Sequence, residues 1–130
     1  MKVSPEGIKF IKYLQKENFL KGFFWRITHI SIYENCVNNI IKIKLKQHQF
    51  DALVSVCFIS RPKEFSKSLL VKYINERYHP QYIQDAFRKL NKPFRRVKID
   101  WQLVWYRQKQ MEYYFGNITN YKDIKKKKRK

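Results

Sequence analysis

Histidines and cysteines are the side chains of this sequence that most readily bind a metal or act as nucleophiles. His29, His48 and His79 stand far apart and match no local metal-ligand spacing. Cys36 and Cys57 form no C-x-x-C motif, and two cysteines are too few for a disulfide framework. We therefore expect no structural metal site, no cofactor and a reducing compartment.

Catalytic motifs are also missing from the sequence. The glycines, Gly7, Gly22 and Gly116, are isolated, so no glycine-rich loop can hold a phosphate. No serine lies in a nucleophile-elbow context, and the acidic residues are scattered singly, whereas acid–base catalysis needs a group with a tuned pKa in a shaped pocket. The sequence thus predicts a protein that is not an enzyme and takes no small-molecule substrate.

Positive charge dominates the chemistry of the sequence. The 130 residues include 29 Lys and Arg against 10 Asp and Glu, a formal net charge of +19, and 17% of the chain is aromatic. A disordered polycation would be poor in aromatic residues, so we expect a folded chain with a polyanionic partner. A run of six cations should form a disordered tail that contacts RNA phosphates or serves as a nuclear-localisation signal. This run comprises Lys125, Lys126, Lys127, Lys128, Arg129 and Lys130.

Arginines are the better candidates for specific contacts, because the guanidinium presents a bidentate fork to phosphate or guanine. Several lie in predicted loops beside the ends of elements, and one lies in the segment 106–116, where cations and aromatic residues interleave. That interleaving fits base stacking, or equally a helix that packs on a neighbouring protein. Outside the tail, the predicted RNA-binding residues are Ser60, Arg61, Lys63, Arg95, Arg96 and Arg107.

The first half of the chain has the pattern of one helix followed by three strands. Ser4-Pro5-Glu6 is typical of a helix start, and apolar residues at helical spacing continue to about residue 17. Alternating or continuous apolar runs predict strands at 23–33, 41–46 and 53–59, with turn residues at 34–39. We expect these strands to form a mainly antiparallel meander.

The second half predicts two helices and a further strand. The first helix is capped by Ser66 or Ser68, the second starts at Pro80, and strict alternation predicts a strand over 97–105. The expected fold class is therefore α+β, with an N-terminal helix, a three-stranded meander, a helical pair, a further strand and a disordered basic tail. The expected division is a domain at 1–64, a helical and aromatic region at 65–121, and the tail at 122–130.

The first half resembles the small-ribosomal-subunit protein eight family. Ile40–Lys46 lies at the place of the second strand of that family, and Ile59-Ser60-Arg61-Pro62 is similar to its closing I-S-K-P or I-S-R-P motif. The preceding segment is similar to the S-K-L-x(n)-I-L-K-x-E-G-F-I helix that leads into these strands, through Ser4, Ile11, Leu14, Glu17, Phe19 and Leu20. The resemblance covers Ser4 to Pro62. It implies a role in a ribosome, with small-subunit rRNA and neighbouring ribosomal proteins as partners.

The amino-acid composition bears on the genome that encodes the chain. Residues with A/T-rich codons are abundant and alanine is scarce, which indicates the mutational bias of an organelle genome or of one of a few AT-rich nuclear genomes, and we expect an organelle-encoded gene. We thus expect a structural rRNA-binding constituent of the mitochondrial small ribosomal subunit, located in the matrix and without membrane insertion. The alternatives are an accessory subunit of another large mitochondrial assembly, such as a respiratory complex, and a small DNA-binding protein.

Overall fold

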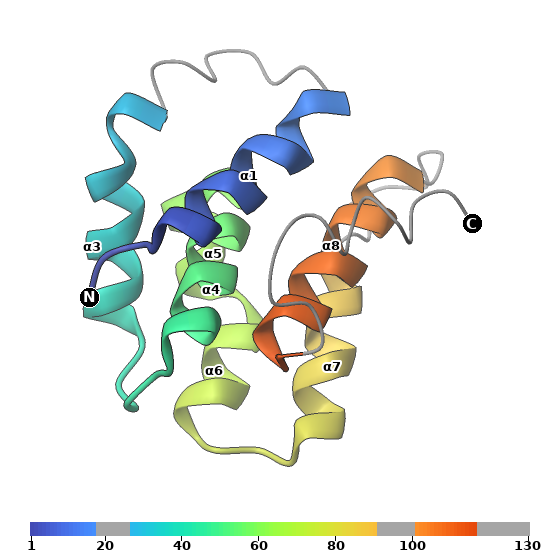
Figure 1. Cartoon of the computed structure of the whole chain (residues 1–130). Helices are drawn as coiled ribbons and strands as arrows, with labels where there is room; N and C mark the ends of the chain where they lie inside the picture. The colour runs from blue at the N-terminus through green and yellow to red at the C-terminus, as the bar shows by residue number, and fades with distance from the viewer. Residues whose placement is uncertain (18–26, 91–100, 117–130) are drawn as a thin grey trace.

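All the regular secondary structure in the described part of the chain is helical. The structure is a computed structural model, and it describes residues 1–17, 27–90 and 101–116. Figure 1 shows α4 running through the middle, with α3 on one side and α7 and α8 on the other. The helices are α1 (Pro5–Glu17), α3 (Ile30–Ile40), α4 (Gln47–Ser60), α5 (Pro62–Lys67), α6 (Leu69–Asn75), α7 (Pro80–Lys89) and α8 (Trp101–Tyr114). No strand occurs in these ranges, so the expected α+β class and its meander are wrong.

The central helix α4 explains the largest error. Its residues Phe50 to Phe58 are all buried, since α4 packs against α1, α3, α5 and α8. A helix that is covered on every side is apolar on every side and loses the periodicity that marks a surface helix. A short apolar run of this kind cannot be distinguished from a buried strand by its pattern. The strand expected at 53–59 is therefore the middle of α4.

The lysine-studded segment 41–46 is extended but pairs with no described strand. Ile41 is buried while Lys42 is exposed, so the expected alternation of side chains is present. The amide of Asn75 takes the place of a neighbouring strand: its Nδ2 donates to the Ile40 carbonyl at 2.9 Å, and its Oδ1 accepts from the Lys42 N–H at 2.6 Å. One side chain thus satisfies backbone groups that a sheet would otherwise have paired.

The helix boundaries were predicted better than the strands. The Ser4 hydroxyl accepts from the Gly7 N–H at 3.0 Å at the start of α1, and the Ser68 hydroxyl accepts from the Val71 N–H at 3.3 Å at the start of α6. Helix α7 begins at Pro80, as expected. The expected turn at 34–39 lies inside α3, which also takes the last residues of the strand expected at 23–33. The strand expected at 97–105 lies partly outside the described residues, and its remainder begins α8.

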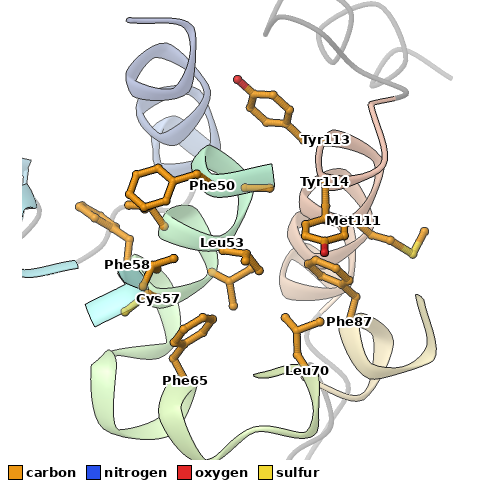
Figure 2. Close-up of a cluster of buried hydrophobic side chains, with 14 of the residues drawn as sticks. Phe50, Leu53, Cys57, Phe58, Phe65, Leu70, Phe87, Met111, Tyr113 and Tyr114 are labelled. Atoms are coloured by element: carbon orange, nitrogen blue, oxygen red, sulfur yellow. The ribbon is translucent and has the colours of Figure 1, made fainter. Parts of the chain in front are cut away.

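The buried core draws on most of the helices. Figure 2 shows Leu53 of α4 on the side of Phe87 and Tyr114, which belong to α7 and α8, while the ring of Phe50 lies on the other side of α4. Phe65 of α5 and Leu70 of α6 close the same cluster. The core therefore contains residues from both sides of residue 64, and the division of the chain at that point stays a prediction. None of the helices in the described ranges has the length and apolar character that a membrane crossing requires.

Candidate functional site

Asp51 is a buried carboxylate that joins three helices. It lies in α4, is 1% exposed, and accepts hydrogen bonds from the Ser4 backbone N–H at 3.1 Å and from the Ser4 hydroxyl. Gln47 Nε2 donates to it at 2.8 Å, and the Tyr113 hydroxyl donates from α8 at 3.4 Å. A buried carboxylate is stable only when donors replace its lost water, and these four donors do so. Asp51 therefore fixes the start of α1 against α4 and α8.

Gly7 allows α1 to approach this carboxylate. A Cβ atom at Gly7 would lie 2.6 Å from Asp51 Cγ and 2.6 Å from Val3 Cγ1, far inside van der Waals contact. The position therefore requires glycine for space, although glycine weakens a helix interior. Nearby, the ring of Phe10 meets the ring of Tyr113 edge-on with centroids 4.4 Å apart, so α1 and α8 are in direct contact.

A hollow of about 390 Å³ opens beside Asp51. Glu6 lies on its rim with a half-exposed side chain and comes within 3.8 Å of Lys9 Nζ. Burial raises the pKa of Tyr113, and the charges of Asp51 and Glu6 raise it further. The phenol therefore keeps its proton and can donate it in a hydrogen bond. The residues that line the hollow are Ser4, Glu6, Gln47, His48, Asp51, Tyr113 and Gly116.

Three side chains that line the hollow can exchange a proton: Glu6, His48 and Asp51. The carboxylate of Asp51 already accepts hydrogen bonds from its four donors. All the donors near Asp51 hold it in a structural role, which leaves the Glu6 carboxylate and the His48 imidazole to meet a ligand. Carboxylate and imidazole groups are the usual side chains for proton transfer. No group of three or more potential metal ligands occurs among residues 1–17, 27–90 and 101–116.

A second hollow of about 400 Å³ has a different character. It lies under the segment between α3 and α4, and among its lining residues Lys44 has the one charged side chain. The other residues that line it are Met1, Val37, Asn38, Ile41, Ile43 and Leu45. This hollow has no acid–base pair and suits an apolar ligand at most.

Arg107 is a buried cation on α8. It is 3% exposed, and its guanidinium donates to Gln110 Oε1 at 2.9 Å and to the Ser60 hydroxyl at 2.6 Å. Burial lowers its pKa to about 10. Arg107 Nε and Gln110 Nε2 find no hydrogen-bond partner in the described part of the chain. Arg107 thus joins α8 to the end of α4 through neutral partners.

The residues expected to bind RNA do not gather at either hollow. Ser60 and Arg107 contact each other, and Arg61 and Lys63 are exposed where α4 meets α5. Arg95, Arg96 and the tail from Lys125 to Lys130 lie outside the described residues. Ligand contact by these residues stays a prediction, except that the burial of Arg107 keeps its guanidinium away from any phosphate.

The residues that build the Asp51 hollow were missed at the level of sequence. Residues 47–51 fall between the strands expected at 41–46 and 53–59, whereas they form the first turns of α4. One signal was available, because Asp51 is a lone acid bordered by the apolar residues Phe50 and Ala52. A charged residue inside such a run is typically buried with several partners.

The fold is similar to that of two solved structures. The muramidase domain of SpmX from Asticaccaulis excentricus is 19% identical, with a TM-score of 0.72, over 87% of this chain and 97% of that chain. An endolysin from Escherichia coli O157:H7 phage FAHEc1 is 18% identical, with a TM-score of 0.76, over 91% of this chain and 96% of that chain. At these identities the similarity shows a common fold. No curated protein matches the chain at a significant level.

A family model described as phage lysozyme matches residues 6–109, most of the chain. The resemblance to a ribosomal protein is therefore wrong, and with it the rRNA and ribosomal-protein partners, the role in translation and the mitochondrial location. Neither the respiratory-complex subunit nor the DNA-binding protein is supported. The expectation of a protein that is no enzyme and has no substrate is also contradicted, because lysozymes are glycosidases. The chain belongs to the phage lysozyme family.

Proposed function

We propose that this protein acts on the glycan strands of peptidoglycan as a muramidase. The family match over residues 6–109 carries the proposal. The common fold with a muramidase domain and an endolysin supports it. In glycosidases of this kind, one carboxyl group protonates the leaving oxygen and a second stabilises or attacks the anomeric carbon.

The carboxylates of the described residues differ in how well they are placed for this chemistry. Glu64 and Glu76 are exposed and do not line the hollow. Glu34 is buried and accepts a hydrogen bond from the Val3 N–H at 2.8 Å. Asp51 is buried and already accepts hydrogen bonds from four donors. Asp85 and Glu112 pair with Arg88 and Lys109. Helix α1 offers two better candidates: Glu6, which lies on the rim of the hollow and also contacts Lys9 at 3.8 Å, and Glu17 in the last turn of α1. The side chain of Glu17 lies outside the described residues. Because both acids belong to α1, Glu6 and Glu17 are the first carboxylates to test.

The positive charge fits a polyanionic substrate. Peptidoglycan carries carboxylates on its stem peptides, and the chain has a formal net charge of +19. A net charge of this size raises the local concentration of an anionic polymer and speeds association, in a way that salt suppresses. Binding to peptidoglycan should therefore weaken as ionic strength rises.

The test uses the full chain and purified peptidoglycan sacculi. Binding is measured by co-sedimentation, and cleavage is measured as new reducing ends. We expect both in the wild type, and we expect Glu6→Gln or Glu17→Gln to lower cleavage at least about a hundredfold while binding persists. Glu64→Gln is the matched control, because Glu64 is an exposed acid of α5 away from the hollow.

The outcomes separate binding from catalysis. A wild-type chain that neither binds nor cleaves sacculi would overturn the whole proposal. Retention on sacculi without new reducing ends would overturn its catalytic part and leave a glycan-binding protein. Equal loss of cleavage in Glu64→Gln would show that the acid variants act through stability and not at a reacting bond.

A further inference from the structure

Three tyrosines form an exposed aromatic cluster where α6 meets α7. The rings of Tyr73 and Tyr78 stack with centroids 4.4 Å apart, and Tyr82 stands edge-on to them at 6.2 Å and 5.7 Å. Tyr78 is 36% exposed and Tyr82 is 53% exposed. We call these three residues the tyrosine platform. It lies on the turn between α6 and α7, at the opposite end of the molecule from the C-terminal end of α1 (Figure 1).

The turn that carries the platform contains one residue with a strained backbone conformation. Arg77 has φ 56°, the left-handed region that favours glycine. The turn is a Schellman motif, since the Tyr78 N–H donates to the Tyr73 carbonyl at 2.9 Å and the Arg77 N–H donates to the Ile74 carbonyl at 3.1 Å. This turn reverses the chain so that the ring of Tyr78 stacks on the ring of Tyr73. The ordered turn means that the platform loses little conformational entropy when a ligand binds.

Tyr82 is fixed from the other side of the turn. His79 caps α7 through its ring Nδ1, which accepts from the Gln81 N–H at 3.1 Å. The Tyr82 N–H donates to the His79 carbonyl at 2.9 Å. All three rings therefore project from backbone that is hydrogen-bonded on both sides of the turn.

Two cations are adjacent to platform residues in the chain: Lys72 precedes Tyr73, and Arg77 precedes Tyr78. Lys72 and Arg77 are exposed, and neither forms an ion pair with another residue of the described ranges. Glu76 is the one acid in the same turn. An amphipathic aromatic surface with unpaired cations suits a ligand that has both apolar faces and negative charge.

We propose that the tyrosine platform is a second binding site for peptidoglycan, separate from the site of cleavage. Pyranose rings present C–H faces that stack on tyrosine, their hydroxyls can bond to the phenols, and stem-peptide carboxylates can pair with Lys72 and Arg77. This inference rests on the proposed function. A second contact with the same polymer raises the overall affinity through effective concentration, without any change in the catalytic groups.

The test compares retention on sacculi with cleavage of a short soluble fragment. We expect Tyr78→Ala and Tyr82→Ala each to weaken sacculus binding about fivefold or more. Cleavage of a soluble peptidoglycan tetrasaccharide, too short to reach both sites, should be unchanged. Ile32→Ala is the matched control, because Ile32 is 42% exposed on α3, away from the platform. Tyr82→Phe keeps the ring and should retain most of the binding.

The results distinguish this inference from the proposed function. If the wild type binds sacculi and the two alanine variants bind as tightly, the platform is no glycan site and the muramidase proposal stands. If weakened binding is matched by a lower thermal midpoint and by equal loss in Tyr82→Phe, the tyrosines act on the fold and the inference fails. If the wild type binds no sacculi at all, the proposed function fails first.

Discussion

Replacing Arg61 by glycine should stabilise the protein. Arg61 joins α4 to α5 with φ 80° and ψ 150°, a conformation that is essentially reserved for glycine. The backbone is held there because the Arg61 N–H donates to the Cys57 carbonyl at 2.7 Å and the Arg61 carbonyl accepts from the Phe65 N–H at 3.0 Å. Pro62 follows and favours an extended ψ at the residue before it. The arginine is therefore strained by its neighbours.

The size of the effect follows from two opposing terms. A residue other than glycine in this region costs about 1–3 kcal/mol. Glycine loses more conformational freedom on folding than alanine does, which destabilises the folded state by about 0.5–1 kcal/mol. The Arg61 side chain is exposed and makes no ion pair in the described ranges, so its removal costs little. Arg61→Gly should thus raise the free energy of unfolding by about 0.5–2 kcal/mol and the thermal midpoint by about 2–8 °C.

Equilibrium urea unfolding of Arg61→Gly and Arg61→Ala tests this reasoning. Alanine also removes the side chain but keeps Cβ, so it should bring no gain. If the two variants have the same midpoint, or if the glycine variant is less stable than the wild type, the strain at Arg61 is refuted.

Three further predictions follow from the buried polar groups. Gly7→Ala should lower the free energy of unfolding by about 2 kcal/mol in urea, because its Cβ would displace Asp51; unchanged stability would refute the close contact. Gln110→Glu should raise the thermal midpoint, because it gives Arg107 a counter-charge and removes an unpaired amide; a lower midpoint would show that desolvation dominates. Burial raises the pKa of Tyr114 from 10.0 to about 12, so its contribution to stability is complete below pH 10 and is lost as pH rises through 12. Tyr114→Phe should therefore reduce the loss of stability measured between pH 10 and pH 12.

The sequence predicted local features of the fold and missed its class. Capping signals at Ser4, Ser68 and Pro80 depend on neighbouring residues only, and the helices start there. The apolar run of α4 depends on what surrounds it, and only the packing of four helices around it shows that it is a helix. Periodicity alone does not contain that information. The resemblance to a ribosomal protein depended on the same misread strands and failed with them.

The site was hidden for a related reason. Asp51 and Gly7 are far apart in the chain, and neither belongs to a local motif that carries chemistry. Their importance comes from a close approach of α1 to α4, which the sequence records only as a lone acid in an apolar run and a glycine inside a helix. Contacts of this kind form only when the helices pack together. A single sequence therefore shows both residues but does not show that they are in contact.

The structure also limits how the net charge can act on a polyanion. Arg107 is 3% exposed and Lys109 is 7% exposed, and Lys109 pairs with Glu112 at 3.4 Å. These two cations are therefore part of the packing of α8, and their charges are not accessible to a ligand. Exposed lysines such as Lys42, Lys44 and Lys72 remain available at the surface. Since exposed charges are screened by salt and buried ones are screened much less, these exposed lysines make the binding of peptidoglycan sensitive to salt.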